Sequence, residues 1–318
     1  MRAVGFDVVG GPEVLRPVEV PAPVPGPGQV LIRVAYAGVN HGEVLHRTGE
    51  CGRPGGLAVP GLEVSGEVAA VGPDVAEPAV GERVAAYLPG GGGYAEYAVA
   101  PAAFAFPLDG VPLREGGGAG LALTTAYGVL AGAARLAAGD SVLIHAAAGG
   151  VGSAAAQIAR ALGASAVYGT VGTPAKAEYA KRFGYDAVYP RDAFTGQAPE
   201  VDVVLDPVGG PTRLASLSLL APFGRLAVYG EAGRHPDLTL PLERLWRCNQ
   251  TLAGYHIGDL GRRAPRLVRS HALSALSLLA SGAIRVDVTA ELPLEQAAEA
   301  HTALAERRTT GKTLLRVR

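Results

Sequence analysis

Cysteine and lysine are scarce in this sequence, and each scarcity excludes a class of protein. Two cysteines, Cys51 and Cys248, occur among 318 residues, and they form no metal-ligand spacing. A disulfide framework is therefore not indicated, and we expect a reducing, cytoplasmic location. Three lysines accompany 25 arginines, and the formal net charge is −1. This balance provides no basic surface for nucleic acid.

Long apolar runs are missing as well. No stretch reaches the roughly 18 residues that a bilayer span needs, and the first residues lack the pattern of a secretory signal. We therefore expect a soluble protein that binds neither membrane nor nucleic acid. Core material is abundant, because 48% of the residues are hydrophobic and 18% are charged. A chain of this length and composition is sufficient for two ordinary domains.

The two parts of the chain differ in pattern. Residues 1–110 are rich in glycine, proline and valine and hold short strand-like runs between turn signals, which predicts a β-rich, partly closed barrel. After about Leu113, helical and strand-like segments alternate, beginning with a helix predicted over Leu121–Leu136. This alternation predicts an α/β domain with a doubly wound parallel sheet. The tail, which ends in a predicted strand at Thr313–Val317, is too short to fold alone, so we expect it to pack on the β-rich domain.

One segment of the second part, Ser141–Gly169, has the pattern of a strand, a tight glycine turn, a helix and a second strand. Glycines at such a junction let the backbone approach a dinucleotide pyrophosphate, and the amides at the helix start face the anion. Ala147 replaces the first glycine of the usual motif, and a tight turn without a ligand is the alternative interpretation. The strand–turn–helix–strand context favours a nucleotide site.

The tip of the second strand indicates which dinucleotide binds. Chains that select NAD usually place an acid about 20 residues after the glycines, whereas no carboxylate occurs here between Thr170 and Glu178. Lys176 can offset the charge of a 2′-phosphate, and Thr173 can donate a hydroxyl hydrogen bond. The alternative is that Thr173 only caps a helix and Lys176 is a solvated helix residue. The missing acid favours NADPH.

Several motifs spread along the chain resemble those of one enzyme family, the zinc-independent quinone oxidoreductases. These zeta-crystallin-like proteins are members of the medium-chain dehydrogenase/reductase superfamily. The resembling segments are His145–Gly152, Gly10–Leu15, Ala37–Asn40, Pro60–Glu63, Val80–Val84 and Thr310–Lys312.

The resemblance implies a fold of two domains. A GroES-like catalytic domain would comprise residues 1–117 and be completed by residues 256–318, and a Rossmann NADPH-binding domain would comprise residues 118–255. The substrate would enter the cleft between the two domains. The resemblance also implies a homodimer that forms through the edge of the Rossmann sheet.

The resemblance further implies roles for individual residues. Asn40 falls on a position that contacts the nicotinamide ribose at the active site. Thr125 falls on a position beside the nicotinamide. The remaining cofactor positions are Gly149, Gly150 and Val151 at the pyrophosphate, Thr173 and Lys176 at the 2′-phosphate, and Tyr229 and Gly230 along the cofactor.

Three positions depart from the family pattern. Leu45 and Cys51 replace two tyrosines that often line the substrate pocket, which leaves the quinone preference open. Pro190 replaces a tyrosine that assists at the 2′-phosphate, and its neighbours Tyr189 and Arg191 are candidates to substitute for it.

Metal-dependent relatives carry Cys-His and Gly-His-Glu where this chain has Asn40-His41 and Gly61-Leu62-Glu63. Leucine cannot bind a metal and an amide is a poor zinc ligand, so we expect no metal; His41 is then a residue of the substrate pocket. The expected activity is hydride transfer from NADPH to a small-molecule quinone. An enone or 2-alkenal acceptor, reduced at its activated double bond, is the first alternative. A non-catalytic nucleotide-binding or structural protein is the second.

Overall fold

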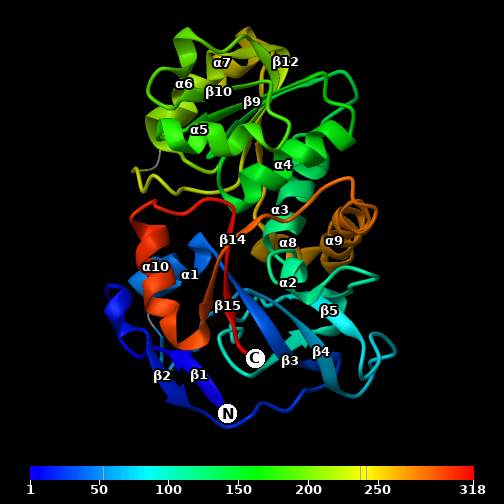
Figure 1. Cartoon of the computed structure of the whole chain (residues 1–318). Helices are drawn as coiled ribbons and strands as arrows, with labels where there is room; N and C mark the ends of the chain where they lie inside the picture. Colours follow the sequence, from blue (N-terminus) through cyan, green and yellow to red (C-terminus); the bar gives the residue numbers. More distant parts are fainter. Residues whose placement is uncertain (53, 237, 241) are drawn as a thin grey trace. The chain divides into compact units, whose positions relative to one another are not determined.

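The computed structural model describes residues 1–52, 54–236, 238–240 and 242–318, and these form two compact units (Figure 1). The first unit comprises Met1–Thr124, Arg263–Ala280 and Val286–Arg318, and the second comprises Thr125–Arg262 and Ser281–Arg285. The sequence-based division at 117/118 and 255/256 stays a prediction. None of the helices in the described residues has the length and apolar character to cross a membrane.

The first unit is built on a seven-stranded sheet with the strand order β14-β15-β3-β4-β5-β7, in which β6 also pairs with β3. Along β3, Val30, Ile32 and Val34 alternate with less buried residues and are wholly buried, as expected for a strand with one face on a core. The strands of this sheet are β3 (Gln29–Val39), β4 (Glu63–Val71), β5 (Arg83–Tyr87), β6 (Tyr97–Pro101), β7 (Ala105–Pro107), β14 (Val288–Pro293) and β15 (Lys312–Arg316). A separate two-stranded sheet pairs β1 (Arg2–Gly5) with β2 (Arg16–Glu19).

The tail of the chain joins this sheet. Strand β15 pairs antiparallel with the end of β3, where Leu315 lies opposite Ala37, and parallel with β14. The expectation that the tail packs on the β-rich domain is therefore confirmed. This pairing brings the start of β15 beside the end of β3.

Four helices of the described residues accompany the sheet: α1 (His41–Thr48), α2 (Leu113–Gly116), α9 (Pro265–Ala280) and α10 (Ala297–Ala305). Short 3-10 turns lie at Pro12–Val14, Ala102–Phe104 and Leu294–Gln296. Helix α1 was not predicted from the sequence. It buries Glu43 and Arg47 together with Val44, so its buried face does not show the apolar periodicity by which helices are recognised.

The second unit contains a six-stranded parallel sheet with the order β10-β9-β8-β11-β12-β13. This is the 3-2-1-4-5-6 order of a doubly wound dinucleotide-binding sheet, which confirms the predicted fold. The strands are β8 (Ser141–His145), β9 (Ala166–Val171), β10 (Ala187–Pro190), β11 (Val201–Asp206), β12 (Leu220–Val228) and β13 (Thr251–Gly254). Strand order reverses between β8 and β11, and ligands of such sheets bind outside the carboxyl ends of the strands at this point.

The remaining helices of the described residues are α3 (Ala122–Tyr127), α4 (Gly150–Ala161), α5 (Pro174–Lys181), α6 (Gly210–Leu217), α7 (Leu242–Arg247) and α8 (Ile257–Arg263). The single helix predicted over Leu121–Leu136 is wrong in its detail. After Tyr127 the chain widens into a π-helical segment, Gly128–Ala133. A run of alanines and leucines satisfies either helical spacing, so composition alone does not distinguish them.

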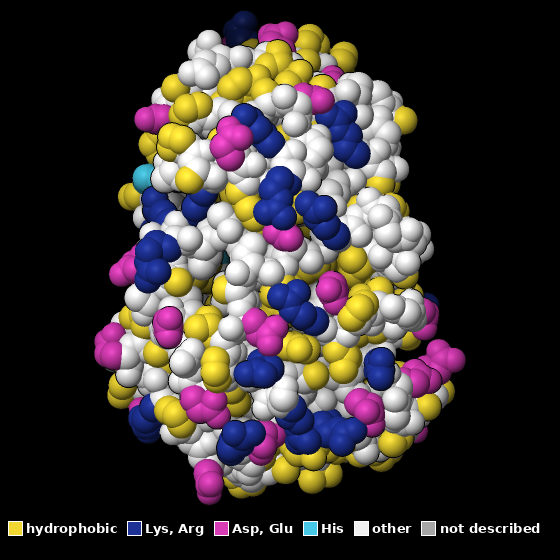
Figure 2. All heavy atoms as spheres, in the orientation of Figure 1, with side chains coloured by type: hydrophobic (Ala, Val, Ile, Leu, Met, Phe, Trp, Pro, Cys, Tyr) yellow, Lys and Arg dark blue, Asp and Glu magenta, His cyan; other side chains and the backbone are white. Residues whose placement is uncertain are grey.

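Basic and acidic side chains alternate over the face of the molecule shown in Figure 2, and neither sign gathers into a patch there. This distribution agrees with the near-zero net charge of the sequence.

Candidate cofactor-binding site

The glycine turn after β8 forms the start of α4. Gly149 is the N-cap residue of this helix, and the first turn contains no acidic side chain. A Cβ atom on Gly152 would lie 2.4 Å from the carbonyl oxygen of Ala146, so only glycine allows the helix to pack this closely on the turn. A Cβ on Gly149 would meet only that same oxygen, at 3.3 Å, and would otherwise stand in open space. The helix start is therefore an accessible cradle of backbone amides suited to an anion.

His145 ties the carboxyl ends of the sheet together. Its ring is fully buried, and its two nitrogens lie 2.7 Å from Thr170 Oγ1 on β9 and 2.7 Å from Ser216 Oγ on α6. Burial lowers the pKa of His145 to about 4. The imidazole is therefore neutral at physiological pH, and it connects β8 to its neighbours as a structural group.

The tip of β9 carries hydroxyl and cationic groups. Thr173 is the exposed N-cap residue of α5, and its side chain makes no capping hydrogen bond, so the alternative that Thr173 serves only as a cap is not supported. Lys176 lies in the first turn of that helix and is half-buried. Arg191 follows β10 and donates its backbone N–H to Val171 O at 2.9 Å. A Cβ on Gly172 would lie 2.9 Å from Arg191 Nη2, so the glycine allows the guanidinium to approach the tip.

A buried ion pair fixes the turn after β11. One oxygen of Asp206 accepts hydrogen bonds from the backbone amides of Val208 and Gly209, and the other accepts from Arg213 Nε at 2.7 Å. Arg213 also donates to Gly230 O at 3.0 Å, and the Tyr229 amide donates to Asp206 O at 3.0 Å. The predicted cofactor residues Tyr229 and Gly230 are thus held against the end of β11. Sequence reasoning missed Arg213, because nothing in its local pattern distinguishes it from a surface arginine.

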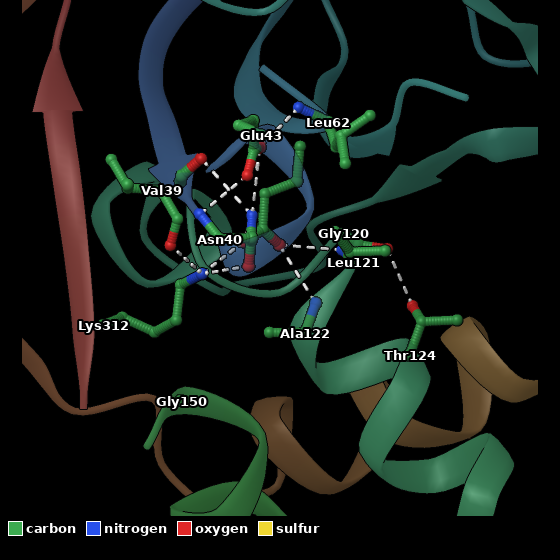
Figure 3. Close-up of polar contacts among 12 residues, drawn as sticks. Val39, Asn40, Glu43, Leu62, Gly120, Leu121, Ala122, Thr124, Gly150 and Lys312 are labelled. Atoms are coloured by element: carbon green, nitrogen blue, oxygen red, sulfur yellow. Dashed lines mark hydrogen bonds and ion pairs between the residues drawn. The ribbon is translucent and has the colours of Figure 1, made fainter. Parts of the chain in front are cut away.

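In the first unit, Asn40 lies at the end of β3 and begins helix α1 (Figure 3). Its backbone N–H donates to Glu43 Oε2 at 2.8 Å, and its side-chain Nδ2 donates to Glu63 Oε1 at 3.0 Å. Its side-chain oxygen accepts from Lys312 Nζ at 2.7 Å. Helix α1, β4 and β15 therefore all contribute a group that holds this one residue.

Glu63 and Lys312 form a buried ion pair. The Glu63 side chain is 0% exposed and that of Lys312 is 4% exposed, and Nζ lies 2.5 Å from Glu63 Oε1. The second oxygen of Glu63 accepts from the amides of Leu121 and Ala122 at 2.7 and 3.2 Å. Lys312 directs its remaining hydrogen bond at Val39 O, 3.2 Å away. Both buried charges are thus compensated by hydrogen bonds.

This set of donors does not fit a zinc site. Zinc binds four ligands in a tetrahedron, whereas Glu63 is already engaged by four hydrogen-bond donors and Leu62 offers no ligand atom. Within the described ranges, no three or more His, Cys, Asp or Glu side chains are grouped so as to hold a metal ion.

The other predicted site residues are distributed over both units. Thr125 is a half-buried residue of α3 in the second unit. His41 and Leu45 lie on α1 in the first unit and are also half-buried. Cys51 is exposed in the turn that follows α1. Partial burial, and then the charge of Glu50, raise the pKa of the Cys51 thiol, so it lacks the environment of a reactive nucleophile.

Comparison with known proteins matches both units to one group of enzymes. Residues 26–110 match the family model "Alcohol dehydrogenase GroES-like domain", and residues 150–272 match "Zinc-binding dehydrogenase". A quinone oxidoreductase of Pseudomonas aeruginosa is 34% identical over 99% of this chain and 99% of its own length. The chain belongs to the quinone oxidoreductases of the medium-chain dehydrogenase/reductase superfamily.

Other members of this superfamily show how widely the fold is used. A mycobacterial protein solved in complex with NADPH is 34% identical, with a TM-score of 0.91 and coverage of 100% of both chains. The synaptic vesicle membrane protein VAT-1 homolog of Rattus norvegicus is 33% identical over 92% of this chain and 78% of its own. Identity differs little between proteins with such different names, so the substrate of this quinone oxidoreductase homologue must be argued from its site.

The two glycines of the turn have different roles and can be separated by substitution. Gly152→Ala should cost about 1–3 kcal/mol of unfolding free energy, because the methyl group would overlap backbone atoms. Gly149→Ala should leave stability nearly unchanged but weaken binding of NADPH, because the methyl group would stand in the amide cradle. Thermal melts and fluorescence titrations measure the two effects. Equal stability losses in both variants would contradict this division.

Glu43 should give the first unit a distinctive pH dependence. Burial raises the pKa of Glu43 to about 7 from an ordinary value of 4.5, so the folded state retains a proton that the unfolded state releases. Stability should therefore decline as the pH rises from about 4.5 to 7, by about 3 kcal/mol from this group.

The difference in unfolding free energy between wild type and Glu43→Gln isolates this contribution. Urea unfolding at pH 5 and pH 8 should show wild type losing stability relative to the variant at the higher pH. The buried histidines titrate in both proteins, so their contributions cancel. A difference that does not change with pH would show that Glu43 stays ionised in the folded state.

Proposed function

We propose that this chain is an NADPH-dependent, zinc-independent oxidoreductase that reduces a quinone. The observation that carries the proposal is that Glu63 is not available as a zinc ligand. Its carboxylate already accepts hydrogen bonds from Lys312, Asn40 and two backbone amides. Without a metal to polarise a carbonyl, the site is unsuited to oxidising a simple alcohol. It suits an acceptor that is already electrophilic, and the named activity of the relatives supports a quinone.

The residues present fit the dinucleotide. The amides at the start of α4 (Gly149, Gly150 and Val151) would bind the pyrophosphate, and Thr173 and Lys176 would bind the 2′-phosphate. Arg191 adds a positive charge at the same strand tip, and no acid follows β9 until Glu178. The mycobacterial relative binds NADPH, which agrees with this donor set.

At the nicotinamide end, Asn40 and Thr125 would orient the ring, and Tyr229 with Gly230 would flank the cofactor. When bound, the cofactor supplies the hydride, and the protein supplies position and shielding. His41, Leu45 and Cys51 would line the acceptor pocket.

A homodimer also forms part of the proposal. Strand β13 is the last strand of the six-stranded sheet and has one unpaired edge among the described residues. Phe223 lies in β12, the strand that pairs with β13, and Trp246 lies in α7, which precedes β13 in the sequence; the two residues are 77% and 68% exposed. An open sheet edge and exposed large apolar side chains both favour association with a second copy.

Cofactor selectivity tests the 2′-phosphate site. The protein should bind NADPH more tightly than NADH, and Lys176→Ala should cost roughly 1–3 kcal/mol with NADPH, the value of a charge-assisted hydrogen bond. The loss with NADH should be small. Lys181→Ala, an exposed lysine of the same helix, is the matched control. Equal losses for both cofactors in Lys176→Ala would mean that Lys176 does not contact the phosphate.

Acceptor preference tests the pocket. Leu45 and Cys51 stand where relatives often place tyrosines, so the pocket should favour larger apolar acceptors, which bury more surface at roughly 25 cal/mol per Å². We expect a higher kcat/KM for naphthoquinone and phenanthrenequinone than for 1,4-benzoquinone, after correction for their intrinsic reactivity with NADPH. The double variant Leu45→Tyr/Cys51→Tyr should reduce this preference.

The acceptor panel includes a long enone and a 2-alkenal, and each assay is repeated with a chelator. Faster reduction of the alkenes than of any quinone would replace the quinone assignment with double-bond reduction. No turnover of any acceptor would favour a non-catalytic nucleotide-binding protein. Loss of activity with the chelator would contradict zinc independence.

A further inference from the structure

Lys312 has an unusual environment for a lysine. Its side chain is 4% exposed, and lysines are almost never buried to this extent unless paired. Its three ammonium hydrogens match three acceptors: Glu63 Oε1 at 2.5 Å, Asn40 Oδ1 at 2.7 Å and Val39 O at 3.2 Å. Two of these acceptors belong to Asn40 and the residue that precedes it. The lysine is therefore directed at the end of β3.

The ion pair determines which way the Asn40 amide faces. Lys312 presents only donors and Glu63, as a carboxylate, presents only acceptors. The Asn40 oxygen faces the ammonium, and its nitrogen faces the carboxylate. The reversed amide would place N–H against N–H and oxygen against oxygen, so one orientation is strongly preferred.

A fixed amide has a defined remaining hydrogen-bonding capacity. Asn40 Oδ1 accepts from Lys312 Nζ, and the capping box at the start of α1 also directs it at the backbone N–H of Glu43. The second Nδ2 hydrogen has only distant acceptors, Gly38 O and Glu43 Oε1, both at 3.4 Å. Asn40 is only partly buried, so it can offer this Nδ2 hydrogen in a fixed direction to a ribose oxygen.

We infer that Lys312 is a positioning residue, which with Glu63 orients the Asn40 amide toward the nicotinamide ribose. The inference rests on the proposed function, because it assumes that Asn40 contacts the cofactor there. It assigns a role to the returning strand β15 beyond completing the sheet. Because the Lys312 side chain is buried, we assign its effect to the hydrogen bond with Asn40 and not to a contact of its own with cofactor or acceptor.

The test separates the two halves of the cofactor. NADPH reports on the whole dinucleotide, whereas 2′,5′-ADP carries only the adenosine half and should not depend on Asn40. Lys312→Met leaves Glu63 buried without its counter-ion, which can prevent folding. The double variant Glu63→Gln/Lys312→Met removes both charges and keeps hydrogen-bonding capacity at position 63, so it serves as the main variant. Lys181→Met is the matched control on an exposed lysine.

In the double variant we expect NADPH to bind about tenfold more weakly, as for the loss of a hydrogen bond to a well-positioned partner, while 2′,5′-ADP binds as to wild type. The kcat at saturating NADPH should also fall, because the ring is less well oriented. Lys181→Met should match wild type in each measurement. Unchanged NADPH affinity and kcat in the double variant would overturn the inference, and so would equal weakening of NADPH and 2′,5′-ADP, which indicates general damage.

Asn40→Ala distinguishes failure of the inference from failure of its premise. If Asn40→Ala weakens NADPH but not 2′,5′-ADP while the double variant has no effect, only the role of Lys312 is wrong. If Asn40→Ala has no effect on NADPH, then the assignment of Asn40 in the proposed function fails, and the inference fails with it.

Discussion

The first unit depends on the charge of Lys312 being buried beside that of Glu63. Removing two charges from water is costly unless each is paired and fully hydrogen-bonded. This requirement is met only when β4, the start of α3, the end of β3 and the start of β15 all reach their final positions, because each contributes a group to the pair. The ion pair is therefore stable only in the complete fold of the first unit, and it links four elements as well as two side chains.

At the centre of the second unit, the elements are held together by a neutral side chain and by close packing, and not by a buried charge. The neutral His145 joins β8, β9 and α6. Gly152 allows helix α4 to begin close to the turn that follows β8. A buried ion pair, Asp206 with Arg213, lies in the turn on the other side of the point where strand order reverses. In a doubly wound sheet, the carboxyl ends of the strands are open to a ligand. The side chains at these ends form hydrogen bonds with the turns that follow the strands. These hydrogen bonds fix the backbone conformation of the turns before a ligand binds.

The sequence allowed the larger features to be predicted because they have local signals. Strand periodicity, glycine spacing and the absence of an acid after β9 can each be read within about 30 residues, the length of one βαβ unit. The polar networks have no such signal. Glu63 and Lys312 are 249 residues apart, and Asn40 and Lys312 are 272 apart.

Within the candidate site, the same limit explains what was missed. Asn40 and Glu63 could be singled out by resemblance, but only the fold shows that they share a lysine. Helix α1 was missed because Glu43 and Arg47 lie buried where a helix usually shows apolar residues. The widened segment at Gly128–Ala133 was missed because alanine-rich sequence is compatible with more than one helical pitch.

The late return of β15 has a consequence for how the chain folds during synthesis. Strand β3 emerges from the ribosome early, yet the partner of its second half, residues 36–39, is translated more than 270 residues later. Throughout that interval this half of the strand exposes backbone donors and acceptors on one side, and Glu63 has no counter-ion from Lys312. An open strand edge in a nascent chain is a site for mispairing with other chains. The first unit therefore cannot complete its sheet until the last strand is made, whereas the six strands of the parallel sheet in the second unit are consecutive in sequence, so this sheet can form earlier.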